Sequence, residues 1–251
     1  SLASRRPATT LNAGRYNVTL GQSVLIEWAA PDGRKLRGAL LLPAGYRPGL
    51  RYPLVVDVYG DTRMSTNVNH FGLGSGATPL SDFQHLATRG YAVLQPDSVA
   101  RGEFLMRDLA ACVLSGVDEV VARGIADPER LAVRGHSFGG YSVFALIVQT
   151  DRFKAAMSYA GPADLVGVYS PMLTDGTHFA ASLFEEKLGG SLWEHPERFI
   201  KNSPLFYFDR VRTPVLILQG ADDTAVFPHQ SDQAFNALRR LGKRVSYAKY
   251  F

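Results

Sequence analysis

Ser137 is the residue in this sequence whose type and surroundings are best suited to covalent chemistry. It stands in the pattern G-x-S-x-G, with Gly135 two residues before it and Gly139 two residues after it. A serine on a tight turn presents its hydroxyl clear of the backbone, and the N–H that follows can face a developing oxyanion. The glycines allow two stretches of backbone to pass too closely for a Cβ atom. The pattern predicts a nucleophile, the alternative being a glycine-rich turn that holds a serine by chance.

The segments on either side of the serine decide between these two interpretations. Residues 131–133 form an apolar run that predicts a strand, and residues 141–149 have the pattern of a helix. A strand followed by a sharp turn and a helix is the context that a nucleophile elbow requires. We therefore favour Ser137 as a nucleophile, with the N–H of the next residue, Phe138, as a donor to the oxyanion.

A serine hydroxyl is a poor nucleophile at neutral pH, so the remaining partners must be found. It needs a histidine to take its proton and a carboxylate to orient that histidine. In α/β-hydrolases the three follow in the order Ser, Asp, His. Asp222 and Asp223 lie on the turn after an expected buried strand at 215–218. The alternative is an Asp-Asp turn that serves only backbone hydrogen bonds.

The six histidines do not offer a convincing base. They are His70, His85, His136, His178, His195 and His229. His136 adjoins the nucleophile at the variable position of the elbow. His229 opens the expected helix after Asp223, where a surface or capping role is favoured. His178 and His195 lie in an irregular segment that precedes both aspartates.

The order of the predicted elements indicates the fold that would position these residues. The expected strands are 16–20, 23–29, 35–42, 53–59, 91–94, 131–134, 154–159, 215–218 and 244–251, and the expected helices are 80–88, 104–123, 141–149, 178–188, 194–200 and 228–241. After an antiparallel start, strands and helices alternate, which predicts a mostly parallel sheet with helices on both faces. We expect a loose segment at 1–15 and one domain over 16–251. Functional groups gather at the carboxyl ends of such strands.

Five segments, taken in this order, resemble the catalytic domain of the prolyl oligopeptidase family, which includes dipeptidyl-peptidase and acylaminoacyl-peptidase types. They are YPLVVDVYG at 52–60, DPERL at 127–131, GHSFGGY at 135–141, NSPL at 202–205 and TPVLILQG at 213–220. The resemblance runs from about Val18 to the end and implies an α/β-hydrolase fold with serine hydrolase activity. A β-propeller typically precedes this domain in the family, and about fifteen residues precede the first expected strand of this sequence.

The resemblance also implies roles for particular residues. Ser137 would be the nucleophile. In the family pattern G-x-x-D-x-x-V the acid is the third residue after the glycine, which selects Asp223 over Asp222. Tyr59 matches a tyrosine whose hydroxyl holds the oxyanion together with the Phe138 N–H.

The family's histidine follows the strand that begins here at Arg244, and that position lies beyond Phe251. We therefore expect the polypeptide to continue and the base to lie a few residues further on. A polypeptide that ended at Phe251 would lack the base and have little hydrolase activity.

Three functions are compatible with these residues. The first is a serine peptidase that acts on short peptides or acylated amino acids, and the second is a carboxylesterase with the same machinery. The third is a non-catalytic module of the same fold whose triad is incomplete. Aromatic and apolar side chains in the irregular segment 162–210 suggest either an apolar specificity pocket or ordinary packing. They are Tyr169, Met172, Phe179, Phe184, Trp193 and Phe199.

The composition and charge of the chain argue against several other classes of function. The chain has 251 residues, 46% of them hydrophobic and 20% charged, which suits one large domain with a buried core. Its net charge of +4 is mild and its cations are scattered, so we expect no nucleic-acid partner. No apolar stretch reaches membrane-spanning length and no signal-peptide core is present, so we expect no membrane insertion. Compartment and oligomeric state stay open.

Cofactor and metal signatures are absent from the sequence. It contains no H-E-x-x-H pattern and no His/Cys cluster at metal-ligand spacing. It has no G-x-G-x-x-G after a strand and no phosphate-binding loop, so we expect neither a metal nor a nucleotide cofactor. Cys112 falls on the apolar face of an expected helix and is interpreted as a core residue. The expected partner is a peptide or a small ester substrate.

Overall fold

One mixed sheet organises the molecule. The computed structural model describes residues 18–74, 83–169, 172, 176 and 179–251. Within them the strands are β1 (Ser23–Ala29), β2 (Lys35–Leu41), β3 (Tyr52–Asp57), β4 (Ala92–Pro96), β5 (Ala126–His136), β6 (Ala155–Tyr159), β7 (Val215–Gly220) and β8 (Val245–Tyr250). They lie in the order β1-β2-β4-β3-β5-β6-β7-β8. The expected loose segment 1–15 lies outside the described residues, and residues 18–20 form no strand, so that part of the strand expected at 16–20 is wrong.

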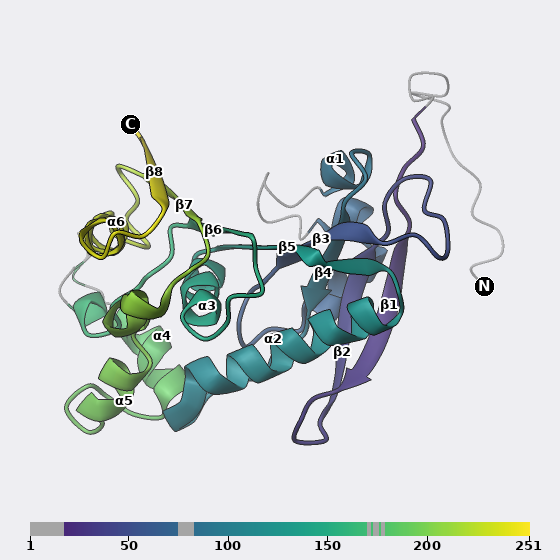
Figure 1. Ribbon diagram of the computed structural model, residues 1–251. Coiled ribbons are helices and arrows are strands. Elements are labelled where there is room, and N and C mark those ends of the chain that lie inside the picture. Colours follow the sequence, from purple (N-terminus) through teal and green to yellow (C-terminus); the bar gives the residue numbers. More distant parts are fainter. Residues whose placement is uncertain (1–17, 75–82, 170–171, 173–175, 177–178) are drawn as a thin grey trace, which may run out of the picture.

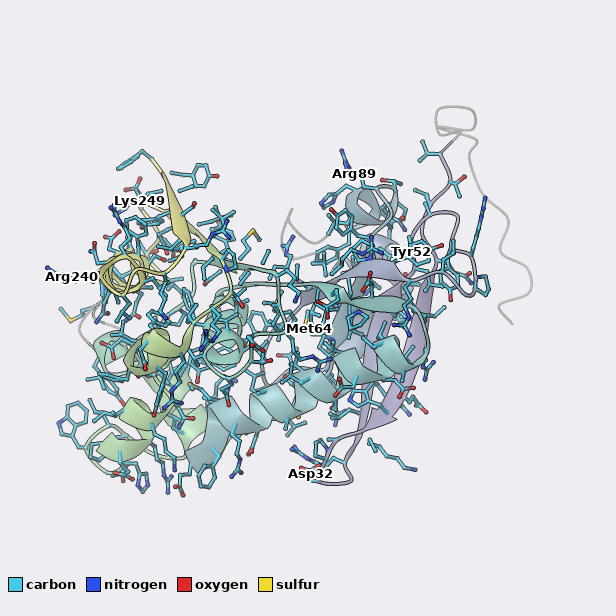
Figure 2. All side chains as sticks on the ribbon, in the orientation of Figure 1. Asp32, Tyr52, Met64, Arg89, Arg240 and Lys249 are labelled. Atoms are coloured by element: carbon cyan, nitrogen blue, oxygen red, sulfur yellow. The ribbon has the colours of Figure 1, made fainter. Side chains whose placement is uncertain are left out.

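The sheet is antiparallel at its start and parallel elsewhere, as the α/β-hydrolase interpretation predicts. β2 pairs antiparallel with β1 and with β4, and the remaining neighbours pair in parallel. A turn at residues 31–33 joins β1 to β2, and the Gly33 N–H donates to the Ala30 carbonyl at 2.8 Å. Gly33 has a φ of 83°, a value that glycine adopts without strain. Figure 2 shows the neighbouring Asp32 at the free end of this hairpin.

The helices cover both faces of the sheet. They are α1 (Gln84–Ala87), α2 (Leu105–Ala122), α3 (Phe138–Ile147), α4 (Phe179–Leu188), α5 (Pro196–Lys201) and α6 (His229–Arg240). Short 3-10 turns occur at Met64–Asn69, Phe71–Leu73, Gly102–Phe104, Gly167–Tyr169 and Pro204–Arg210. In Figure 1, α2 and α3 lie below the sheet, α1 lies above it, and α6 lies beside β7 and β8 at the far end. This arrangement confirms the predicted fold class.

Several element boundaries differ from the sequence expectation, and two of these differences have a clear physical reason. β5 begins at Ala126 rather than near 131, because Ala126 pairs with Tyr52 of β3 before a register shift. Residues 127–130, three of them charged, have no strand pattern, so the sequence did not predict this part of β5. α3 begins at Phe138, three residues early, because Gly139 and Gly140 lack side chains and let the first turn approach neighbouring backbone.

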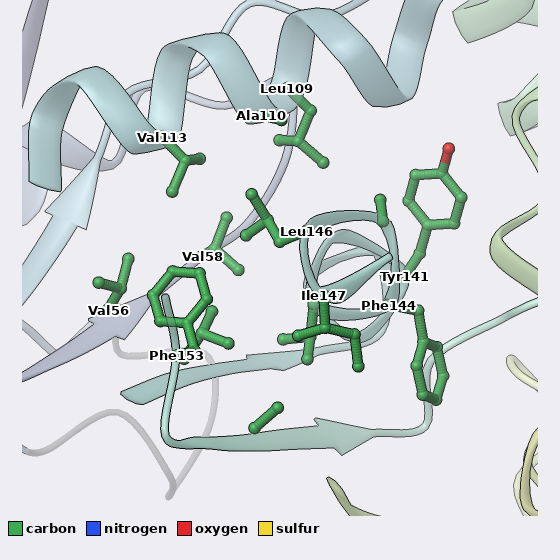
Figure 3. Packing of buried hydrophobic residues seen from close by; sticks show 14 of the residues in the cluster. Val56, Val58, Leu109, Ala110, Val113, Tyr141, Phe144, Leu146, Ile147 and Phe153 are labelled. Atoms are coloured by element: carbon green, nitrogen blue, oxygen red, sulfur yellow. The ribbon is translucent and has the colours of Figure 1, made fainter. Parts of the chain in front are cut away.

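The main core lies between the sheet, α2 and α3. Figure 3 shows Leu109 and Val113 of α2 above Leu146 of α3 and Val58, which follows β3. All four side chains are buried in one cluster, and Cys112 belongs to the same cluster, as predicted. Burial of this apolar surface stabilises the fold by roughly 25 cal/mol per Å² removed from water. The core therefore holds fixed the sheet edge at which β3 and β5 end.

Candidate active site

Ser137 occupies the turn between β5 and α3 with a strained backbone. Its φ is 58° and its ψ is −122°, a region that residues with a side chain rarely adopt. The Ser137 N–H donates to the Tyr159 carbonyl at 2.9 Å, and the Ser137 carbonyl accepts the Tyr141 N–H at 3.1 Å. Such backbone strain costs about 1–3 kcal/mol and persists only where the surroundings enforce it. The strand, the turn and the helix predicted around Ser137 are all present.

The glycines of the motif are required by close contacts with backbone. A Cβ atom on Gly135 would lie 2.3 Å from the Gly139 carbonyl oxygen. A Cβ atom on Gly139 would lie 2.3 Å from the Val58 carbonyl oxygen. Gly140 packs in the same way against Gly161, whose Cα would lie 2.6 Å from the added atom. Only glycine fits at these positions, so the pattern read from the sequence has a steric basis in the fold.

Tyr59 and Phe138, the two expected oxyanion donors, belong to segments that pack against each other. Their ring centroids lie 6.1 Å apart. Gly60 donates its N–H to the Ser142 Oγ at 3.1 Å, and that hydroxyl donates to the Phe138 carbonyl at 2.7 Å. A Cβ atom on Gly60 would come within 2.8 Å of the Phe138 ring. Ser142 therefore fastens the loop after β3 to the first turn of α3.

Asp223 lies in the loop after β7 and is held by its neighbours. Its Oδ1 accepts the N–H groups of Ala225 at 2.9 Å and Val226 at 3.0 Å. Its Oδ2 accepts from Gln219 Nε2 at 3.3 Å. Asp223 is half-buried, whereas Asp222 is exposed. Asp223 is therefore fixed by three hydrogen bonds and is the less exposed of the two aspartates.

His136 is the last residue of β5, and its ring packs in a tilted arrangement against Tyr159, with ring centroids 4.6 Å apart. Burial lowers the pKa of the His136 imidazole, the charge of Asp223 acts in the opposite direction, and Arg134 lowers it further. His136 is therefore close enough to Asp223 for their charges to interact. Its ring packs on Tyr159 in a position that the sequence could not indicate.

The other histidines are placed differently from one another. His229 is exposed at the start of α6 and makes no side-chain cap there. It lines the same pocket as Ser137, a position that the sequence did not predict. His195 precedes α5 without capping it, and its Nδ1 lies 3.9 Å from Glu197. His178 lies outside the described residues. The pocket position of His229 follows from the loop 221–228, which returns the chain across the site.

A small pocket opens beside Ser137. Its lining is mainly apolar and comes from the turn before α3 and its first residue, from α4, from the segment after β6, from the loop after β7 and from the start of α6. The lining residues are Ser137, Phe138, Pro162, Val168, Leu183, Phe184, Ala225, Val226, Phe227, His229 and Gln230.

Of the side chains expected to form an apolar pocket, Phe184 does so. Tyr169 packs instead against Trp193 and Phe199, with centroids 5.3 and 5.6 Å apart. Met172 is exposed, and the Phe179 side chain is outside the described part of the chain. Both expectations for this segment are therefore met in part: Phe184 lines the pocket and Tyr169 and Phe199 take part in ordinary packing, whereas Trp193 is largely exposed.

The described residues contain no group of three or more His, Cys, Asp or Glu side chains that could hold a metal ion. None of the helices in this part of the chain is long and apolar enough to cross a membrane.

Comparisons with known proteins agree on one family. The family model described as the prolyl oligopeptidase family matches residues 106–251. An uncharacterized peptidase, YuxL, of Bacillus subtilis is 30% identical over 238 residues, which cover 90% of this chain and 34% of YuxL. The chain thus spans about a third of the length of this relative.

Solved structures show the same relation. A puromycin-hydrolyzing peptidase of Mycobacterium tuberculosis superposes with a TM-score of 0.74 at 28% identity, covering 94% of this chain and 36% of that one. An acylaminoacyl peptidase of Pyrococcus horikoshii superposes with a TM-score of 0.77 at 21% identity over 98% of this chain and 39% of that one, which shows the shared fold. The family match covers more than half of the chain and includes the elbow and the Asp223 loop, so the chain belongs to the prolyl oligopeptidase family.

Proposed function

We propose that this chain is the catalytic part of a serine peptidase that cleaves peptide or acyl-amino-acid bonds through an acyl-enzyme on Ser137. The observation that carries the proposal is the strained backbone of Ser137 at the mouth of the apolar pocket, between the Tyr59 loop and the Asp223 loop. Strain of this kind is retained at functional sites because it holds a reacting group in place. The peptidases named among the relatives support a peptide substrate.

In this proposal the serine oxygen attacks the carbonyl carbon of the substrate. A base takes the Ser137 proton as the C–O bond forms, and the Phe138 N–H and the Tyr59 hydroxyl hold the oxyanion. The tetrahedral intermediate then collapses, the C–N bond breaks, and the amine leaves with the proton from the base. Water attacks the acyl-enzyme by the same steps and restores the serine hydroxyl.

The base in this proposal is a histidine that follows β8. β8 pairs in parallel with β7, so that Tyr250 lies opposite Gly220. The Ala221 N–H donates to the Tyr250 carbonyl at 2.7 Å. The carboxyl end of β8 therefore lies beside the loop that carries Asp223. A residue that follows β8 would enter the site next to the carboxylate that must orient it.

The pocket lining supports a substrate with an apolar side chain next to the scissile bond. Leu183 and Phe184 of α4 form one wall, and Val226 and Phe227 form another. Burying a leucine or phenylalanine side chain in such a pocket contributes about 1.5–3 kcal/mol. We therefore expect aromatic or branched aliphatic side chains to be preferred over charged ones at this subsite.

The full-length polypeptide, treated with a fluorophosphonate probe, tests the proposed nucleophile. We expect one label per chain on Ser137, complete loss in Ser137→Ala, and wild-type labelling in Ser246→Ala, which changes an exposed serine of β8. Labelling that survives in Ser137→Ala would refute the assignment. Absence of labelling in the wild type would favour a non-catalytic module.

A comparison of N-acetyl-phenylalanine p-nitroanilide with the corresponding p-nitrophenyl ester separates the peptidase from a carboxylesterase. The triad chemistry is common to both reactions, so only turnover distinguishes them. We expect cleavage of the anilide. Turnover of the ester alone would contradict the peptidase assignment.

A further inference from the structure

A buried cluster of charges connects α4 to the loop that carries Tyr59. Asp61 Oδ2 accepts from Lys187 Nζ at 3.0 Å and from Arg101 Nε at 2.8 Å. The Lys187 and Asp61 side chains are only 10% and 6% exposed. Arg101 also contacts Glu186 at 3.1 Å and is more than half exposed. Taking an ammonium and a carboxylate out of water is costly, so their burial at this position needs a reason.

Lys187 contacts Phe138 directly and is connected to the Tyr59 loop through Asp61. Its Nζ lies 4.4 Å from the centroid of the Phe138 ring, at a distance where the cation is attracted by the aromatic face. Through Asp61 it also holds the loop that contains Tyr59, two residues earlier in the chain. One buried side chain thus joins the residue that would offer the backbone donor to the segment that would offer the hydroxyl donor.

The backbone of the loop at Asp61 lies in the left-handed region and is held there by side-chain contacts. Asp61 has a φ of 53°, in the left-handed region that costs a residue with a side chain free energy. Its N–H donates to Ser98 Oγ at 2.9 Å, and its carboxylate makes the two ion pairs with Lys187 and Arg101. These contacts fix the direction in which the chain leaves Tyr59 and Gly60.

The same helix also forms the pocket. Leu183 and Phe184 lie four and three residues before Lys187, respectively, which places all three on one face of α4. Phe184 packs against Phe138 with ring centroids 5.7 Å apart. A substrate side chain in the pocket therefore touches the helix whose lysine holds Phe138 and the Tyr59 loop.

We propose that Lys187, paired with Asp61, is a positioning residue that holds the two oxyanion donors in register. This inference rests on the proposed serine hydrolase function and assigns to the lysine a part in transition-state stabilisation without contact with the substrate. Misplacement of a donor by about 1 Å costs on the order of a hundredfold in rate. Because the lysine acts through Phe138 and Asp61, its loss affects the transition state more than the binding of the substrate.

Lys187→Met in the full-length protein removes the charge and keeps the length of the side chain. With N-acetyl-phenylalanine p-nitroanilide we expect kcat to fall about tenfold to a hundredfold, with KM within about twofold of wild type. A peptide boronic acid bonds to the serine and occupies the oxyanion site, so its inhibition constant should rise by a similar factor. Lys187→Arg, which keeps the charge, should restore part of kcat.

Lys201→Met is the matched control. Lys201 pairs with Glu103 at 2.8 Å and lies 4.0 Å from the centroid of the Phe104 ring, so it makes the same two kinds of contact away from Ser137. We expect wild-type kcat and boronate affinity in this variant. Asp61→Asn offers a second route, because asparagine tolerates the left-handed backbone while removing the carboxylate charge. It should lower kcat by a factor similar to that of Lys187→Met, and the double variant should lose no more than either one alone.

A Lys187→Met protein that melts at a lower temperature but keeps wild-type kcat and boronate affinity would overturn the inference. So would equal effects in Lys187→Met and Lys201→Met. If Lys187→Met does not fold, the Asp61→Asn variant decides by the same two measurements. Fluorophosphonate labelling of the wild type keeps this inference distinct from the proposed function. A labelled, active wild type with an unaffected Lys187→Met overturns only the positioning role, whereas an unlabelled, inactive wild type overturns both.

Discussion

Ser142→Ala tests how the site is held together, because it removes a hydroxyl that serves two segments at once. Ser142 is fully buried, accepts the Gly60 N–H at 3.1 Å and donates to the Phe138 carbonyl at 2.7 Å. Alanine in its place leaves the Gly60 N–H buried without its acceptor. Gly60 follows Tyr59 directly, so the loop that would supply the oxyanion hydroxyl loses its anchor.

The structure sets the size of the expected effect. A lost hydrogen bond costs about 0.5–1.5 kcal/mol, and a buried donor left unsatisfied costs about 1–3 kcal/mol. We therefore expect Ser142→Ala to lower the free energy of unfolding by about 2–3 kcal/mol. For a chain of this size that corresponds to a fall in melting temperature of roughly 4–12 °C.

Ser158→Ala is the matched control, because Ser158 is equally buried and its hydroxyl also bonds to the first turn of α3. Its Oγ donates to the Gly140 carbonyl at 3.2 Å. Among the described residues no backbone N–H donates to the Ser158 hydroxyl, so its removal leaves no N–H unsatisfied. We expect a loss of about 1 kcal/mol. Urea unfolding followed by tryptophan fluorescence measures both variants, with unchanged m-values as the condition for comparison. If Ser142→Ala loses no more stability than Ser158→Ala, the anchoring argument is wrong.

Three further predictions concern the acid, the motif glycine and pH. Asp223→Asn should lower kcat/KM by roughly 10³–10⁴-fold while the exposed Asp222→Asn stays within about twofold, measured with the anilide substrate; equal losses would refute the choice between them. Gly135→Ala should lower the free energy of unfolding by about 3 kcal/mol or more, because its Cβ would lie 2.3 Å from a backbone oxygen. Gly45→Ala meets no atom within 4 Å and should lower it by about 1–2 kcal/mol because of its positive φ. Similar urea midpoints for the two variants would contradict this reasoning. Burial lowers the pKa of His136 below its ordinary 6.5, so the unfolded chain binds the proton first as the pH falls, and the free energy of unfolding decreases from pH 6.5 down through the folded pKa. His136→Gln should reduce the difference in urea midpoint between pH 7.5 and pH 5.5. An unchanged difference would exclude a contribution of His136 to the pH dependence of stability.

Local patterns in the sequence predicted most of the strands and helices of the fold. Apolar runs predicted the parallel strands, and helical spacing predicted α2, α3 and α6 within a few residues, because burial of one face leaves a repeat in the sequence. The pattern failed where pairing alone makes the strand. Residues 126–130 carry no alternation, yet they extend β5 because Ala126 pairs with Tyr52.

The sequence by itself determined the elbow, because the steric demand for glycine around Ser137 acts over a few neighbouring residues. Residue order and the family pattern likewise indicated Tyr59 and Asp223. Only the tertiary structure decided which side chains hold these groups in place. Asp61 and Lys187 are 126 residues apart, and Gly60 and Ser142 are 82 apart. A charge pair or a buried hydroxyl has no periodicity to mark it, and its partner is fixed only when the sheet brings distant loops to one edge. The same reason kept His229 from being placed in the pocket.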